Sequence, residues 1–282
     1  RIQQYYRTVF TKLVNSIHRD WRCRCVKNFI KNCMINISSA LSFIYRDEDI
    51  NFIYYHDVVK SNGYRYQKIE VCNFVEQMKY IYNSGLKTLL FRDLNNEHES
   101  GDRKVLISFD DGYRSNYEVV FPIMKRLKLK FNVFLEVGAI DKDPKYLTWD
   151  MIRRMKYSGL VDFGAHTYNH VDLRDIENND MEIEIFKANE EISKNVEMSV
   201  EDFCFPFGAY NKNIINYLVS LGVYKRLYTS DGIRKIVKNN TTIYGRIGVE
   251  NDDSLEVFRK KLQGKYNLYY KMSRNFRELT NS

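Results

Sequence analysis

From residue 51 onward, short apolar runs typical of strands alternate with segments of helical periodicity. The run at residues 105–109 (VLISF) is continuously apolar except for Ser108, as expected for a strand that is buried on both faces. Strands that alternate with helices at this spacing indicate βα units and a parallel sheet. Roughly seven or eight strands fit the length, so the pattern suits a barrel as readily as an open sheet. The predicted strands are residues 51–56, 86–91, 105–109, 131–137, 161–165, 203–205, 224–229 and 242–247, and the predicted helices are residues 74–84, 116–127, 149–157, 181–196, 214–220 and 254–262.

The positive charge of the chain is concentrated at its beginning. Residues 1–46 hold nine Lys and Arg residues and a single acid, Asp20, whereas residues 47–282 hold 35 basic and 35 acidic residues. A basic face spread over the whole fold is therefore absent, which argues against a protein that binds nucleic acid. Apolar residues recur at helical period in the first part of the chain, so we expect a basic helical extension at residues 1–46 and a globular domain at residues 47–282.

The basic helical extension has two interpretations. Its charged face is either simply solvated or makes peripheral contact with an anionic membrane. The chain begins at Arg1 and not at a methionine, so the sequence leaves open whether a signal or an anchor precedes it. The expected location is the cell envelope or a membrane surface.

The first chemical motif follows the apolar strand at residues 105–109, which ends in Asp110, Asp111 and Gly112. Parallel α/β folds place their active sites at the carboxyl ends of strands. Two charges at a buried strand end are costly unless something pairs with them, and a divalent metal would do so. One carboxylate could bind the metal while the other acts as a general base. A helix N-cap is the structural alternative, but it accounts for one aspartate better than for two.

The second motif is HTYNH, which follows the strand predicted at residues 161–165 and contains two of the five histidines, His166 and His170. Two histidines four residues apart can face one point, and imidazole is the commonest metal ligand. Two histidines and one aspartate leave positions open for water and substrate, as a catalytic metal site requires. A lone histidine would more often be structural, but this pair favours a metal.

Together with the segment FCFPFG at residues 203–208, these motifs resemble the first three motifs of the polysaccharide deacetylases (NodB homology, carbohydrate esterase family 4). Their order and spacing agree, and the resemblance covers about residues 50–265. It implies an α/β fold, namely a distorted (β/α)7 TIM-like barrel. It also implies a metal-dependent hydrolase that removes N-acetyl groups from amino sugars of a polysaccharide of the N-acetylglucosamine type.

The resemblance also implies roles for individual residues. Asp110 would be the general base, and the backbone N–H that follows Pro206, that of Phe207, would help to hold the oxyanion. Tyr113 lies beside the first motif and could stack on a sugar face. The ligands of a divalent metal, usually Zn2+, would be Asp111, His166 and His170.

The sequence departs from the usual family pattern at two points. No histidine follows His170, although the family usually has one in a late Leu-x-His motif, and Cys204 stands where the third motif usually has an arginine. The chain is similar to the branch that deacetylates poly-N-acetylglucosamine, in which the barrel order is circularly permuted and an early histidine takes the late position. A closed barrel brings its first and last strands together.

His56 is therefore the expected general acid, and a structural histidine at a strand end is the alternative. Asp57 or Asp231 could tune it. Arg246 resembles a late Arg-Ile segment of the same branch, and it would either replace the missing arginine near Asp110 or be an ordinary strand-end arginine. Two other functions stay open: a C–N hydrolase acting on a lipid-linked sugar, a nucleotide-linked sugar or a small molecule, and a non-catalytic glycan-binding module.

Overall fold

The computed structural model of the chain describes residue 35 and residues 50–60, 67–96, 103–176, 178–232, 234–267 and 269–270. The expected basic helical extension at residues 1–46 lies, apart from residue 35, outside the described residues. In the described part of the chain, no helix is both long enough and apolar enough to cross a bilayer.

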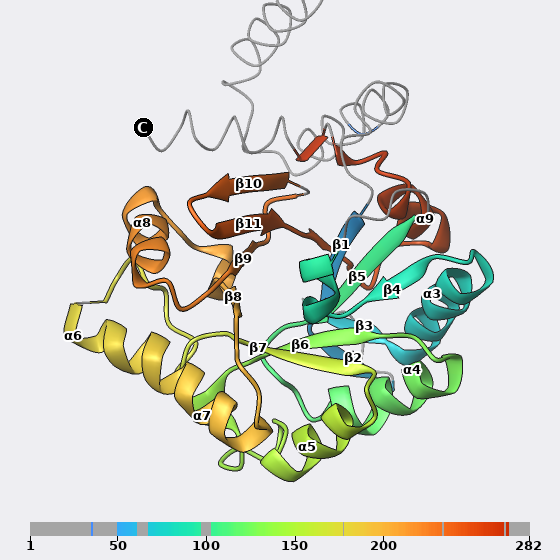
Figure 1. Cartoon of the computed structure of the whole chain (residues 1–282). Coiled ribbons are helices and arrows are strands. Elements are labelled where there is room, and N and C mark those ends of the chain that lie inside the picture. Colours follow the sequence, from blue (N-terminus) through green and yellow to red (C-terminus); the bar gives the residue numbers. More distant parts are fainter. Residues whose placement is uncertain are drawn as a thin grey trace, which may run out of the picture.

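A sheet of ten strands forms the centre of the fold (Figure 1). The strands pair in the order β10-β11-β9-β8-β7-β6-β5-β1-β12, and β4 lies beside β5. Every pair is parallel except β10 with β11. The strands are β1 (Ile50–Tyr55), β4 (Lys87–Leu89), β5 (Lys104–Phe109), β6 (Phe131–Leu135), β7 (Val161–Ala165), β8 (Asp202–Cys204), β9 (Arg226–Thr229), β10 (Arg234–Lys238), β11 (Thr241–Gly245) and β12 (Ile247–Gly248).

The last strand segment joins the two ends of this sheet. Arg246 alone separates β11 from β12, and β11 pairs with β9 whereas β12 pairs with β1, with Ile247 opposite Ile53. Residues 241–248 therefore link β9 to β1, and β1, β5, β6, β7, β8, β9 and β11–β12 occupy seven parallel positions in a distorted, incompletely closed ring. This arrangement agrees with the expected distorted (β/α)7 barrel, and it places the carboxyl ends of all seven on one side.

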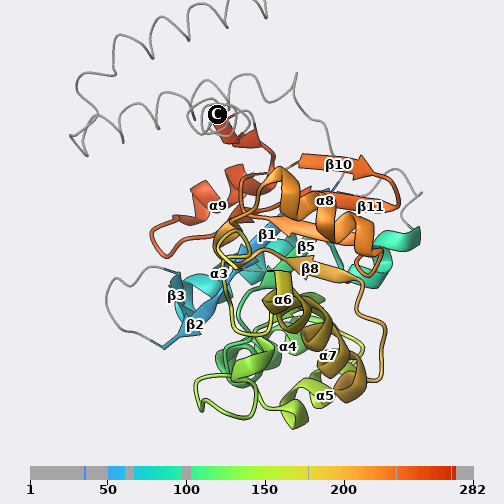
Figure 2. The same cartoon turned by 90° about the vertical axis from the view of Figure 1, so that its left-hand side faces the viewer.

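Helices cover the outside of the ring (Figures 1 and 2). Polar caps mark where several begin, because a side-chain oxygen can accept an otherwise unpaired backbone N–H of the first turn: Thr148, Asn211 and Ser254 do so. The α-helices are α3 (Val71–Asn83), α4 (Phe121–Leu127), α5 (Trp149–Tyr157), α6 (Asn178–Met181), α7 (Ala188–Val196), α8 (Lys212–Leu221) and α9 (Leu255–Leu262). Shorter helical turns are the 3-10 turns η1 (Phe91–Asn96), η3 (Val137–Ala139) and η5 (Pro206–Gly208) and the π-helical turns η2 (Asn116–Val120) and η4 (Glu182–Lys187).

Two apolar cores result from the alternation of side chains along the strands. Odd positions of β5 such as Ile107 pack outward under the helices, whereas Leu106 packs inside the ring. Continuing the inner row by steps of two leads from Leu106 through Ser108 to Asp110, at the carboxyl end. The inner core consists of Phe52, Leu89, Phe91, Leu106, Phe134, Cys204, Tyr228 and Tyr244.

The structure adds two features that the sequence patterns did not predict. A separate pair of parallel strands, β2 (Asp57–Val59) and β3 (Lys68–Glu70), follows β1, and β10 is an antiparallel edge strand. Both β2 and β3 are only three residues long, too short for a periodic signal. β10 has the sequence RKIVK, in which only the two central residues are apolar, too few for a strand pattern.

Candidate active site

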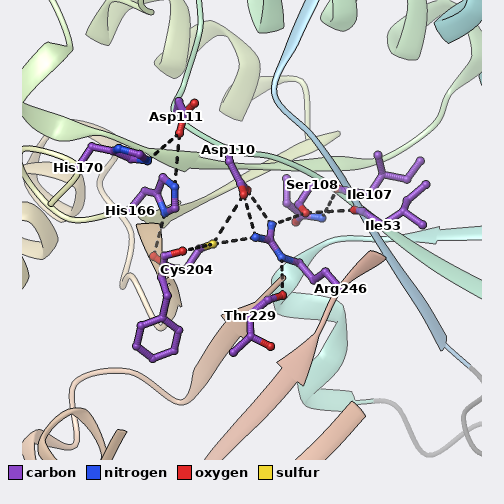
Figure 3. Close-up of polar contacts among 12 residues, drawn as sticks. Ile53, Ile107, Ser108, Asp110, Asp111, His166, His170, Cys204, Thr229 and Arg246 are labelled. Carbon is purple, nitrogen blue, oxygen red and sulfur yellow. Dashed lines mark hydrogen bonds and ion pairs between the residues drawn. The ribbon is translucent and has the colours of Figure 1, made fainter. Parts of the chain in front are cut away.

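Three segments at the carboxyl ends of β5, β7 and β8 meet in one place (Figure 3). Each contains residues in the left-handed backbone region, which is strained for any residue other than glycine. Of the nine non-glycine residues with positive φ in the described part of the chain, four lie in these segments. They are Asp111, Thr167, His170 and Phe207, with φ values of 70°, 63°, 54° and 58°. Strain of this kind persists where the surroundings hold it, and it is common at functional sites.

Asp111, His166 and His170 are brought together by the structure. The Nε2 atoms of His166 and His170 lie 3.4 and 3.3 Å from Oδ1 of Asp111 (Figure 3). One ligand atom of each residue lies within 4.8 Å of the others, and Asp111 and His166 are buried. The three donors come from two loops, the one after β5 and the one after β7.

The chemistry of these donors fits a divalent metal. Oδ1 of Asp111 is buried and has no hydrogen-bond partner, which is costly unless a cation meets it. Donor atoms held tetrahedrally at about 2.0–2.1 Å from a zinc ion lie roughly 3.3 Å from one another, close to the two distances observed. The three residues are therefore a candidate metal site.

The ring of His166 is held in one orientation. Its Nδ1 lies 2.8 Å from the carbonyl oxygen of Cys204, which can only accept, so Nδ1 carries the hydrogen. Nε2 of His166 is then left as the lone-pair nitrogen that faces Asp111. A backbone partner of this kind is typical of metal-binding histidines, because it fixes both tautomer and ring orientation.

The charges in the site are coupled. Burial disfavours the charged form of Asp111, but the neighbouring imidazoles of His166 and His170 outweigh it and hold the pKa of this carboxyl well below its usual range. Burial likewise opposes the charged form of His170, yet its contact with Asp111 raises the pKa of the imidazole. The carboxylate thus stays ionised and available to a cation.

A second group of possible ligands also has its donor atoms within 4.8 Å of one another. It consists of Asp110, His166 and Cys204. A metal is disfavoured there because the guanidinium of Arg246 donates to Cys204 Sγ at 2.8 Å and would repel a cation. Burial also raises the pKa of the Cys204 thiol well above its ordinary value, so the thiolate that a metal needs is suppressed. We therefore assign the candidate metal site to the other set.

Asp110 is paired with Arg246 inside the ring. The guanidinium donates to both carboxylate oxygens, with Nη1–Oδ1 and Nη2–Oδ2 distances of 2.7 and 2.8 Å (Figure 3). Arg246 is fully buried, and it also donates to Ser108 Oγ at 2.9 Å and lies over the ring of Tyr54, 4.6 Å from its centroid. Burial disfavours the Asp110 carboxylate, but Arg246 outweighs this cost and lowers the pKa of Asp110. Of the two possibilities for Arg246, the structure therefore shows the one beside Asp110.

His56 lies next to Asp110 across two neighbouring strand ends. Tyr55 and Phe109 are opposite each other in the parallel register, and the Asp110 N–H donates to the Tyr55 carbonyl at 2.9 Å. Burial lowers the pKa of His56, against the opposing effect of the charges of Asp110 and Asp111. The imidazole is thus largely neutral near pH 7 in the metal-free site.

Two residues after the first motif attach the His56 segment to the β5 loop. Asn116 Nδ2 donates to the His56 carbonyl at 3.3 Å, and Ser115 Oγ donates to Asp57 at 2.7 Å. The carboxylate of Asp57 also accepts from Lys68 at 2.8 Å. Asp231, the other residue considered as a partner of His56, accepts from Tyr210 at 2.7 Å.

The remaining predicted residues line the surroundings of this centre. The Phe207 side chain is 69% exposed and meets the His170 ring edge-on, with centroids 4.5 Å apart, while Pro206 beside it is buried. Tyr113 stacks on Tyr146 with centroids 5.1 Å apart. Both tyrosines are available as aromatic surface beside the loop that carries Asp111.

Sequence reasoning missed Glu136, which follows β6 directly. Its N–H donates to the Asp111 carbonyl at 3.3 Å, and its pKa is raised, because burial outweighs the opposing effect of His170. The rule that active-site groups follow the carboxyl ends of parallel strands could have found Glu136. Sequence reasoning also missed Glu184, which lies in η4 and holds the loop between His166 and His170. No local sequence pattern marks that residue.

Comparison with known proteins agrees with this geometry. Residues 97–225 match the family model of the polysaccharide deacetylases. The matched part of the chain, which includes Asp110, Asp111, His166 and His170, is thus similar to a polysaccharide deacetylase domain. Metal dependence is general in this family, and the Asp111, His166 and His170 set is the candidate for it here.

Two curated relatives and one solved structure define the likeness further. The Bacillus subtilis protein YxkH, named for the same family, is 24% identical over 182 residues, which are 63% of this chain and 63% of that protein. The match thus spans less than two thirds of that relative. The poly-β-1,6-N-acetyl-D-glucosamine N-deacetylase of Staphylococcus aureus is 23% identical over 234 residues, 76% of this chain and 78% of that protein. The Streptococcus pyogenes deacetylase PplD, solved in complex with acetate, superposes with a TM-score of 0.68 at 22% identity, covering 76% of this chain and 97% of that one, which establishes the shared fold.

Proposed function

We propose that this protein is a zinc-dependent hydrolase that removes N-acetyl groups from amino sugars of a polysaccharide of the N-acetylglucosamine type. The observation that carries the proposal is the juxtaposition of an ionised, arginine-paired carboxylate, Asp110, with the donor set Asp111, His166 and His170. A carboxylate beside an open metal site is the arrangement that hydrolysis of an amide by activated water requires. The similarity to a poly-N-acetylglucosamine deacetylase supports the substrate class.

In this proposal Asp111, His166 and His170 hold the metal. When bound, the metal supplies Lewis-acid polarisation of the acetyl carbonyl and a water of lowered pKa. Asp110 accepts the proton of the attacking water, and Arg246 keeps its carboxylate ionised and aimed into the site.

Two further groups act on the acetyl amide. The backbone N–H of Phe207 donates to the acetyl oxygen as negative charge develops there, a role helped by the left-handed turn at φ 58°. His56 donates a proton to the departing amine, which leaves as the free amino sugar while the acyl group leaves as acetate. Burial lowers the pKa of His56, so the protonated imidazole gives up its proton more readily.

The domain organisation and location belong to the same proposal. Residues 47–282 form the deacetylase barrel, and residues 1–46 form a basic extension that holds it at an anionic membrane surface of the cell envelope. The support is the charge distribution, since the excess of positive charge lies entirely in residues 1–46. Binding to vesicles with and without anionic lipid, for the full chain and for a chain lacking residues 1–46, tests it. Equal binding of both chains would refute it.

The catalytic proposal is tested by measuring acetate and free amine released from N-acetylglucosamine oligomers by the zinc-loaded protein. We expect Asp110→Asn to abolish turnover while bound zinc stays at the wild-type amount, and the exposed Asp150→Asn on α5 to behave as wild type. Turnover of a lipid-linked or nucleotide-linked N-acetyl sugar, without turnover of the oligomers, would change the assigned substrate from a polysaccharide to that sugar. Full activity of Asp110→Asn would remove Asp110 from the mechanism.

A further inference from the structure

Glu184 lies in η4, away from the three metal-donor residues, yet both of its carboxylate oxygens face the loop that carries two of them. Oε2 accepts the backbone N–H groups of Tyr168 and Asn169, each at 2.9 Å, and Oε1 accepts from Asn169 Nδ2 at 2.7 Å. The residue is 5% exposed. Three N–H donors therefore compensate the buried charge, and two of them are consecutive backbone groups that form an anion-binding nest.

The opposite side of the same loop is held by η3. The N–H of Val137 donates to the Thr167 carbonyl at 3.4 Å, and that of Gly138 donates to the Tyr168 carbonyl at 2.6 Å. A Cβ atom on Gly138 would come within 2.6 Å of that carbonyl oxygen, so the two backbones approach as closely as glycine allows. The loop thus lies between Glu184 on one side and η3 on the other.

The loop needs this external support. Thr167 and His170 have φ values of 63° and 54°, and each residue held in such a region costs of order 1–3 kcal/mol. The strain at His170 is what turns its imidazole back towards Asp111 after a separation of only four residues. Without a partner for the N–H groups of Tyr168 and Asn169, the loop would relax and carry His170 away from that point.

Glu184 lies in a π-helical turn, on the buried face that it shares with Met181, Ile185 and Ala188. In η4, Glu182 and Ile183 are exposed whereas Glu184 and Ile185 are buried. A π-turn costs helix stability and is found mostly where a function repays it. Backbone N–H groups form stronger hydrogen bonds with a carboxylate than with a neutral acceptor. Glu184 supplies such a carboxylate to the N–H groups of Tyr168 and Asn169.

We propose that Glu184 is a positioning residue that pre-organises the loop between His166 and His170 for metal binding. The inference rests on the proposed metal site and concerns how the backbone of this loop is held. Its consequence is that Glu184 sets the affinity for the metal while taking no part in the chemistry.

The test is a zinc titration of the full chain against a chromophoric chelator at neutral pH. We expect Glu184→Ala to raise the zinc dissociation constant about 10–100-fold, as loss of a supporting partner around a metal site does. Glu184→Gln should give a smaller increase, because its amide oxygen still accepts from the backbone and Asn169 can turn its own amide to match. Glu182→Ala, an exposed glutamate of the same turn, should bind zinc as the wild type does.

A second measurement separates positioning from general stabilisation. At saturating zinc, turnover of Glu184→Ala should return close to the wild-type value, whereas a purely structural role would lower the thermal midpoint of the metal-free protein and leave the zinc dissociation constant unchanged. If Glu184→Ala does not fold, Glu184→Gln carries the test. Wild-type zinc affinity in the folded variant would overturn the inference alone. Failure of the wild type to bind zinc would overturn the proposed metal-dependent function as well.

Discussion

Arg246 and Asp110 form a buried charge pair whose removal has a calculable cost. The two N–O distances of 2.7 and 2.8 Å describe two charge-assisted hydrogen bonds, each with a net contribution of about 1.5–3 kcal/mol. Breaking a buried pair by removing one partner costs about 3–5 kcal/mol, because the other charge is left uncompensated. We expect Arg246→Met, which keeps much of the side-chain volume, to lower the free energy of unfolding by an amount in this range.

A double-mutant cycle isolates the pair. Asp110→Asn alone should also destabilise, since it leaves Arg246 fully buried without its carboxylate. The double variant Asp110→Asn, Arg246→Met carries neither charge, so it should be more stable than either single variant. Urea unfolding of the four proteins followed by circular dichroism gives the free energies. A loss below about 1 kcal/mol for Arg246→Met, or additive losses in the double variant, would refute the reasoning.

The same cycle has a defined pH dependence. Arg246 lowers the pKa of Asp110 in the folded protein, so the stabilisation by the pair is complete above the ordinary carboxyl pKa of about 4 and is lost as the pH falls through the folded value. In Arg246→Met, burial without a counter-charge favours the protonated acid. The difference in stability between wild type and variant should therefore be largest near neutral pH and shrink towards pH 4. A difference that stays constant would show that electrostatic pairing is not its source.

Further predictions concern single positions. Because burial lowers the pKa of His56, the unfolded chain binds its proton more readily, so stability should fall between pH 7 and 5, and His56→Gln should lose less over that range in parallel unfolding curves. Asn116→Ala should lower turnover without changing the zinc dissociation constant, since Asn116 holds the backbone of His56; an unchanged kcat would contradict this. A Cβ on Gly208, at φ 62°, would lie 1.8 Å from Ser230 Oγ, so Gly208→Ala should cost about 1–3 kcal/mol in unfolding measurements, with part recovered on adding Ser230→Ala. Zinc at about 100 times its dissociation constant should stabilise the folded protein by roughly 2.7 kcal/mol, seen as a higher thermal midpoint than after chelation, and an unchanged midpoint would argue against a metal site.

Local sequence patterns predicted the structure correctly where it depends on residues that are close together in the sequence. The run at residues 105–109 predicted β5 because four apolar residues in five suit a strand with two buried faces. The spacing of His166 and His170 predicted convergence because a loop with three intervening residues can bring both histidines to one point. By contrast, β2 and β10 depend on pairing partners elsewhere in the chain, and no local pattern announces them.

The residues around Asp110 show more sharply what the sequence alone could not predict. Asp110 and Arg246 lie 136 positions apart, and the contact exists because residues 241–248 pair with β9 at one end and β1 at the other. The family resemblance suggested Arg246 as a partner, but an ordinary strand-end arginine was equally compatible with the sequence. Strand register decided between the two, since it places Arg246 on the inner face.

By itself, the sequence determined the βα alternation, the carboxylates at the end of β5 and the histidine pair after β7, because these depend on periodicity and on neighbours a few residues away. Only the tertiary structure decided which of those groups meet. It paired Asp110 with Arg246, placed the Cys204 thiol against the same guanidinium, and brought Glu184 to the loop between His166 and His170. The physical reason is that hydrogen bonds and ion pairs act over about 3 Å in space, a distance that separation along the chain does not predict.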